Sequence, residues 1–228
     1  MKKILIIGTI ILSVFLIYLT TIDKKVYYLS LGDEIALGMT KEGYYEKSYT
    51  NYIKEYLENK NKLEIYINQY ETQGYRITDI INDIKNNKEI EETNTTIKNA
   101  LIKADLLTIS IGNNDIKSKI NETKELTNID YNNLNKNINT IINDLNNLLK
   151  LIREYCKEDI VMIGINIKTD DEKINNMIKT ANEKIEEICK NYNIKYINIY
   201  NKIDIYPTKE KYEKLGNIII EEINLLKK

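Results

Sequence analysis

The sequence contains no histidine, and this absence limits the chemistry that the protein can perform. Histidine is the side chain best suited to acid–base work near neutral pH, and it is the commonest metal ligand. Without it, a Ser-His-Asp catalytic triad is excluded. A zinc site would need cysteine or carboxylate ligands, and the two cysteines, Cys156 and Cys189, do not form a CxxC pair. We therefore predict no metal and no other cofactor.

Cysteine itself is scarce, and both cysteines lie in segments with helical periodicity. The simplest interpretation is a pair of buried free thiols. A disulfide between Cys156 and Cys189 is the alternative if the protein works outside the cell, because disulfides persist in oxidising compartments. The sequence by itself does not decide between the two.

An excess of charge of either sign is also lacking. The 228 residues include 33 Lys and Arg and 34 Asp and Glu, a net charge of -1. This balance does not indicate nucleic acid as a partner, since nucleic-acid-binding domains are usually strongly basic. The length and the hydrophobic content of 43% are sufficient for one domain with a substantial core.

The longest apolar stretch is residues 4–22, between Lys2-Lys3 and Asp23. Roughly 19 residues at ~1.5 Å each span about 28 Å, close to the thickness of a bilayer core. We expect residues 1–25 to be an uncleaved membrane anchor with the following domain outside the cytoplasm, since Lys2 and Lys3 favour an inside N-terminus. A cleaved signal peptide and a secreted protein are the alternative, although no clear small-x-small site precedes Asp23.

From residue 26 onward, short apolar runs alternate with segments of helical periodicity. The predicted strands are residues 26–31, 63–67, 106–111, 160–165 and 194–199. The predicted helices are residues 48–59, 77–84, 94–104 (capped by Thr93), 131–156, 171–191 and 209–226. Such alternation favours a parallel sheet covered on both faces. With right-handed crossovers, residues 26–228 are predicted to form a three-layer α/β/α sandwich around a five-stranded parallel, flavodoxin-like sheet.

Four short motifs lie directly after predicted strands or before the last helix. They are Gly32-Asp33-Glu34, Gly74, Gly112-Asn113-Asn114-Asp115 and Pro207. In this order they resemble the blocks of the SGNH (GDSL) esterase and lipase family, namely Gly-Asp-Ser, a glycine, Gly-x-Asn-Asp and Asp-x-x-His-Pro. The resemblance covers residues 26–226. It implies an α/β hydrolytic fold with its site at the carboxyl edge of the sheet.

The resemblance also implies a role for each matched position. In the family, the serine of the first block attacks the ester, while backbone and asparagine N–H groups stabilise the oxyanion. Gly74 and Asn114 match the oxyanion donors. Glu34 occupies the nucleophile position and Tyr206 the histidine position. The aspartate position falls on Ile203.

All three positions of the triad therefore differ from the family pattern. Tyrosine, with an ordinary pKa near ~10, is a poor base at neutral pH. Dismantling a triad lowers the rate about a million-fold. We therefore predict a catalytically impaired, membrane-anchored family member with a binding or structural role toward a small-molecule ester, a lipid or a cell-wall glycan. The alternative is a hydrolase that uses carboxylates, Glu34 with Asp204 or Asp115, because paired carboxylates can perform acid–base catalysis.

Each candidate residue also has a structural interpretation. Three interpretations of Glu34 are open. It is a solvated loop carboxylate, it acts in catalysis, or it folds into the oxyanion site and accepts hydrogen bonds from Asn114 and the Gly74 N–H. Asn114 forms a wall of the site or is only a turn residue. Asp33 and Asp115 are expected to fix their loops through backbone N–H groups.

Two further points concern the remaining side chains of these blocks. Tyr206 is interpreted as either a packed aromatic side chain or an active phenol. Ser30 and Ser110 lie inside predicted strands rather than at their ends. We therefore do not expect either serine to replace the missing nucleophile.

Overall fold

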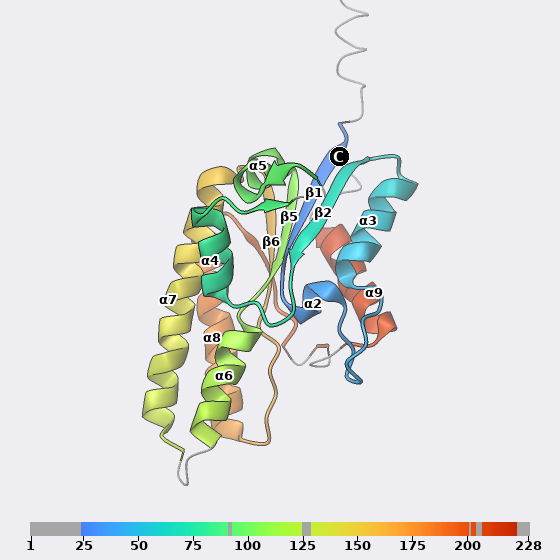
Figure 1. Ribbon diagram of the computed structural model, residues 1–228. Coiled ribbons are helices and arrows are strands. Elements are labelled where there is room, and N and C mark those ends of the chain that lie inside the picture. Colours follow the sequence, from blue (N-terminus) through green and yellow to red (C-terminus); the bar gives the residue numbers. More distant parts are fainter. Residues whose placement is uncertain (1–23, 91–92, 125–128, 201, 204–206, 223–228) are drawn as a thin grey trace, which may run out of the picture.

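The computed structural model in Figure 1 describes residues 24–90, 93–124, 129–200, 202–203 and 207–222. The predicted membrane anchor, residues 1–25, falls almost entirely outside these ranges. Across the described ranges, no helix is both long enough and apolar enough to cross a bilayer. The predictions for Asp204 and Tyr206 also concern residues outside the described part of the chain.

A parallel sheet of five strands forms the middle layer, as predicted. Its strands are β1 (Val26–Gly32), β2 (Leu63–Glu71), β5 (Leu106–Ser110), β6 (Asp159–Ile163) and β7 (Lys195–Ile197). Their order is β2-β1-β5-β6-β7. Since β3 (Glu89–Ile90) and β4 (Thr95–Thr96) form a separate small sheet, this corresponds to the order 2-1-3-4-5 of flavodoxin-like sheets. All carboxyl ends therefore meet at one edge, the lower edge in Figure 1.

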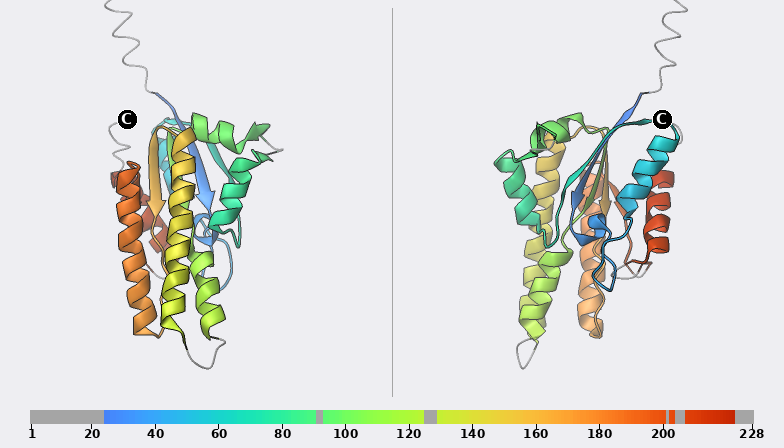
Figure 2. Two further views of the ribbon diagram at one scale, coloured as in Figure 1. Left: turned by 90° about the vertical axis from the view of Figure 1, so that its left-hand side faces the viewer. Right: turned by 45° about the vertical axis from the view of Figure 1, so that its right-hand side comes forward.

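Helices cover both faces of the sheet, which confirms the predicted three layers (Figure 2). One face packs against α3 (Tyr49–Asn59) and α9 (Lys209–Glu222). The other face packs against α4 (Ile77–Lys85), α5 (Ile97–Lys103), α7 (Tyr131–Tyr155) and α8 (Glu172–Asn191). An aliphatic core lies on each face of the sheet, and the helices α4, α7 and α8 carry a stripe of isoleucines and leucines, as the periodicity indicated.

Several predicted boundaries were wrong. The helix predicted at residues 94–104 begins only at Ile97, because β4 (Thr95–Thr96) pairs with β3 (Glu89–Ile90). Its cap is Thr96, whose Oγ1 accepts a hydrogen bond from the N–H of Asn99, and not Thr93.

The sheet strands also differ at their ends. Strand β2 continues to Glu71, beyond the predicted end at residue 67, since Gly32 of β1 still pairs with Glu71. Strands β6 and β7 end two residues before their predicted ends. In both cases the apolar run continues past the last ladder pair, so hydrophobicity alone overestimates the strand.

No helix was predicted between residues 111 and 131, but the motif Gly112-Asn113-Asn114-Asp115 opens helix α6 (Asn113–Lys124). This helix is polar apart from Ile116 and Ile120, which are buried in the core beside α7. Two apolar residues are too few to give a clear helical periodicity, and the helix was therefore missed.

Both cysteines are buried and free, which confirms the first interpretation and not the disulfide. Burial raises the pKa of Cys156 to about 11 and that of Cys189 to about 12. Thiols with such values are almost fully protonated at neutral pH and are therefore poor nucleophiles.

Candidate functional site

The turn after β1 brings the first motif to the carboxyl edge of the sheet. Gly32 lies so close to β5 that a Cβ there would be 2.5 Å from the carbonyl oxygen of Ser110. The N–H of Asp33 donates to this same oxygen at 2.9 Å. Asp33 then caps the short helix α2 (Glu34–Leu37), because its Oδ1 accepts from the N–H of Ile35 at 3.1 Å. Glu34 is thereby the first helical residue beyond the strand.

The Glu34 side chain lies between the two predicted oxyanion donors. Its Oε1 accepts a hydrogen bond from the N–H of Gly74 at 2.9 Å. Its Oε2 accepts one from Nδ2 of Asn114 at 2.8 Å. The solvated-loop interpretation of Glu34 was therefore wrong. The second interpretation, in which Glu34 accepts hydrogen bonds from Asn114 and the Gly74 N–H, is confirmed. Asn114 belongs to the first turn of α6 and is a wall of the site rather than a turn residue.

The two donors are held in place by their own neighbours. Gly74 has a φ of 78°, a left-handed conformation that favours glycine, in a turn closed by the hydrogen bond from the Tyr75 N–H to the Thr72 carbonyl. The amide nitrogen of Asn114 also donates to the carbonyl oxygen of Tyr75 at 3.0 Å. The orientation of the Asn114 amide is thus defined by a carboxylate and a carbonyl, both of which accept from the same nitrogen.

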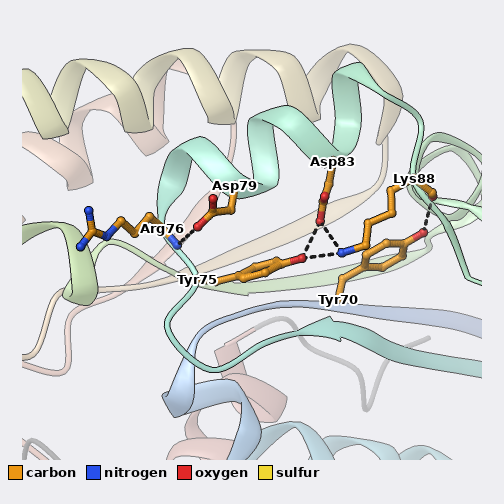
Figure 3. Close-up of polar contacts among 6 residues, drawn as sticks. All are labelled: Tyr70, Tyr75, Arg76, Asp79, Asp83 and Lys88. Carbon is orange, nitrogen blue, oxygen red and sulfur yellow. Dashed lines mark hydrogen bonds and ion pairs between the residues drawn. The ribbon is translucent and has the colours of Figure 1, made fainter.

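The loop that carries Gly74 is tied to helix α4 by a second polar cluster (Figure 3). The hydroxyl of Tyr75 donates to Oδ2 of Asp83 at 2.7 Å. The ammonium of Lys88 contacts both groups, at 2.6 Å from the Tyr75 hydroxyl and 3.1 Å from Asp83. The N–H of Arg76 donates to Asp79 at the start of the helix. Sequence reasoning missed this cluster, because its members are ordinary surface residues until the fold brings them together.

Asp33 is fully buried beneath the site. Its carboxylate accepts hydrogen bonds from the Ser110 hydroxyl at 3.4 Å and from Nδ2 of Asn113 at 3.3 Å. Burial raises the pKa of Asp33 from 3.8 to about 7, and the nearby charge of Glu34 acts in the same direction. Together with the cap on α2, these contacts confirm the expected role of Asp33 in fixing its loop.

Asp115 connects α6 to α4. Its Oδ2 accepts a hydrogen bond from the N–H of Ile77 at 3.3 Å, at the beginning of α4. Burial raises the pKa of the Asp115 carboxyl above its ordinary value. The expected contact with a backbone N–H is confirmed, although Asp115 lies in a helix and fixes a neighbouring element rather than its own loop.

Asn166 connects Asn113 in the site to Ile203, the position that matches the family's catalytic aspartate. Its N–H donates to Oδ1 of Asn113 at 2.9 Å, and its Nδ2 donates to the carbonyl of Ile203 at 3.1 Å. Ile203 is 6% exposed, and the hydrogen bond from Asn166 ties its backbone to the segment that follows β6. Asn166 directly follows the predicted strand 160–165. That position at the carboxyl edge is the only sequence signal that would have indicated Asn166 as a residue of the site.

A second buried carboxyl group, Glu71, lies at the end of β2 on the α3 face. It is 8% exposed, and the Tyr66 hydroxyl lies 3.5 Å from its Oε1. Tyr66 in turn donates to the hydroxyl of Thr50 at 2.8 Å. Burial raises the pKa of Glu71 from 4.5 to about 7. The second strand was predicted to end at residue 67, so the sequence analysis placed Glu71 outside the sheet.

A model of the GDSL-like Lipase/Acylhydrolase family matches residues 30–215, and the chain therefore belongs to this family. The match includes every motif discussed above. A comparison with curated protein sequences finds no match.

Solved structures support the fold. A lipase from a goat rumen metagenome is 17% identical with a TM-score of 0.66, covering 84% of this chain and 94% of that one. A lipase/acylhydrolase from Enterococcus faecalis is 19% identical with a TM-score of 0.59, covering 88% and 95%. An acetylxylan esterase from Geobacillus stearothermophilus is 15% identical with a TM-score of 0.62, covering 90% and 96%.

Proposed function

We propose that this chain is a catalytically impaired SGNH protein, anchored in the cell membrane by residues 1–25 with its domain outside the cytoplasm. In this proposal it acts as a binding or structural module. The observation that carries the proposal is the carboxylate of Glu34, which occupies both oxyanion donors, the Gly74 N–H and the Asn114 amide. The absence of any histidine supports it, since no imidazole is available as a base.

The magnitude of these contacts explains why an ester would compete poorly. Charge-assisted hydrogen bonds contribute about 1.5–3 kcal/mol each before the cost of desolvation is counted. The neutral carbonyl oxygen of an ester is a weaker acceptor than the carboxylate of Glu34. A substrate carbonyl would therefore have to displace a better ligand that is already attached to the chain.

The ligand proposed for this module is a small-molecule ester, a lipid or a cell-wall glycan. An acetylated glycan is one form of such a ligand, since one relative of similar fold is an acetylxylan esterase. The second candidate function is hydrolysis by carboxylates. The raised pKa of Asp115, the residue after Asn114, favours it, because a carboxyl group of raised pKa can act as a general acid.

A fluorophosphonate probe is expected to leave the full-length chain unlabelled. Such probes react with activated serines, and the two serines nearest the site are both buried in strands. Ser30 accepts from the Thr108 hydroxyl, and Ser110 donates to Asp33. The measurement is intact-protein mass spectrometry after incubation with the probe, with an active serine esterase as a positive control.

Stoichiometric labelling of any serine would contradict the loss of serine chemistry. A panel of ester and glycan substrates tests the second candidate in the same samples. Hydrolysis that persists after probe treatment and disappears in Glu34→Gln would favour the carboxylate mechanism over a binding module.

The chain is expected to stay in the membrane fraction after a carbonate wash, because residues 4–22 are long enough to span a bilayer. Protease added to intact cells should then degrade the domain. Recovery from the medium of a mature chain that begins near Asp23 would instead show a cleaved signal peptide.

A further inference from the structure

We propose that a groove rich in lysine at the carboxyl edge of the sheet binds an anionic ligand that carries several phosphate or carboxylate groups. The groove, called the lysine groove below, has a volume of about 1570 Å³. Its basic lining residues are Lys41, Lys168, Lys179, Lys202, Lys209 and Lys211. Nothing in the family match or in the Glu34 cluster assigns a ligand of this class.

The lysine groove is built by segments that come together only in the fold. Its walls are residues 40–46 after α2, residues 166–168 after β6, the first half of α8, residues 200, 202 and 203 after β7, and residues 207–211 at the start of α9. These segments lie around the lower edge of the sheet in Figure 1, where the strands end. In open α/β sheets, ligands bind outside this edge.

The charge of the lysine groove differs from that of the whole chain. Six lysines face three glutamates, Glu42, Glu46 and Glu210, a local excess of three positive charges among the described lining residues. The chain as a whole has a net charge of -1. A concave site lined by one sign of charge raises the local concentration of ligands of opposite sign.

Five of these six lysines form no salt bridge with an acidic side chain in the described part of the chain. Among the residues that the structure describes, seven lysines outside the groove form salt bridges. Within the same described ranges, no salt bridge involves Lys41, Lys168, Lys179, Lys202 or Lys209. Ammonium groups gathered without partners repel one another, and an anion with several charges would relieve that repulsion.

Two asparagines of the inner wall of the groove are held by hydrogen bonds. Asn166 is fixed by the hydrogen bonds to Asn113 and Ile203 described above. Asn175 is held by the Thr169 N–H, which donates to its Oδ1 at 2.9 Å. The six lysines come from five separate segments around this wall, so a ligand with a single charged group would not match their distribution. A ligand with several charged groups fits this distribution.

The orientation of the groove favours a free anion over the lipid head groups of the cell's own membrane. Strand β1 begins at the opposite edge of the sheet, the upper edge in Figure 1, and the proposed anchor immediately precedes it. An anchored domain would therefore present the lysine groove away from the bilayer. The inference does not depend on the loss of catalysis, because none of the groove lysines contacts Glu34.

The test uses the full-length chain in a non-ionic detergent, with sodium tripolyphosphate as the probe and isothermal titration calorimetry as the measurement. Wild type should bind saturably, and more weakly as the salt concentration is raised to about 0.15 M. The double variant Lys168→Glu/Lys202→Glu should bind at least about tenfold more weakly, since each reversal replaces attraction by repulsion. The matched control is Lys136→Glu/Lys150→Glu on α7, which has the same change of charge outside the groove.

The control should retain wild-type affinity, and thermal unfolding should show that both variants are folded. Equal weakening in the two double variants would overturn the proposal, because it would indicate only the net charge. Absence of saturable binding by wild type would overturn it as well. A second arm uses vesicles of phosphatidylglycerol. Vesicle binding that the groove variant loses, without any binding of tripolyphosphate, would assign the groove to a membrane surface and reject a free anion.

Discussion

Replacement of Glu34 by serine is expected to leave the chain without esterase activity, whereas the triple variant Glu34→Ser/Ile203→Asp/Tyr206→His should hydrolyse short-chain esters. The single change removes the carboxylate from the Gly74 and Asn114 donors and supplies a hydroxyl. It supplies no base, because the chain contains no histidine. The measurement is the rate of p-nitrophenyl acetate hydrolysis above the rate of a heat-denatured sample.

The expected difference is large because the triad acts as a unit. Oxyanion donors and binding alone give ~10³–10⁴ over water, and an intact triad adds about a million-fold. The triple variant need recover only a part of this to be measured. Ile203 is suited to the test because its backbone is fixed by Asn166 under the carboxyl edge of the sheet.

Two controls make the result interpretable. Asn114→Ala in the triple background should lower the rate about 10²–10³-fold, the usual effect of losing one oxyanion donor. Serine-dependent turnover by Glu34→Ser alone would show that the base lies elsewhere. A folded but inactive triple variant would show that positions 203 and 206 were wrongly assigned.

The stability of the folded chain is expected to fall as the pH rises through 7. Burial raises the pKa of Asp33 and that of Glu71 to about 7, from 3.8 and 4.5. The folded state therefore favours the protonated carboxyls. The resulting stabilisation is complete below the ordinary pKa values and is lost as the pH rises through about 7. Each pKa unit corresponds to ~1.4 kcal/mol, so the upper limit is roughly 3 to 5 kcal/mol for each group.

The absence of histidine makes this measurement unusually direct, because no imidazole titrates in the same range. Urea unfolding followed by circular dichroism between about pH 5 and pH 9 would give the free energy of unfolding at each pH. Glu71→Gln keeps the size of the side chain and should make the profile flatter. Glu64→Gln, at an exposed position of the same strand, should not. A wild-type profile that rises or stays flat over this range would contradict the prediction.

The chain order of strands and helices was predictable because each element carries its own signal. The apolar runs and the isoleucine stripes of α7 and α8 are local properties, and right-handed crossovers leave few ways to arrange them. The convergence of Glu34, Gly74 and Asn114 was predictable for a related reason. All three follow parallel strands, whose carboxyl ends must share one edge.

What the sequence could not show depends on contacts between segments that are distant in the chain. The place of the Glu34 carboxylate was left open, because the sequence was compatible with solvent, with the oxyanion site and with a catalytic role. The donors of two other elements decided it. In the same way, the burial of Glu71 depends on the Tyr66 and Thr50 hydroxyls, and the helix at Asn114 depends on packing against α7.

The sequence by itself determined which chemistry is excluded, because a missing histidine is missing in every conformation. It also determined the order of the layers, since the periodicity of a segment is local. Only the tertiary structure decided where the carboxylates point, which of them are protonated near neutral pH, and which lysines line one groove. These properties are set by distance and burial, and both arise when remote segments pack together.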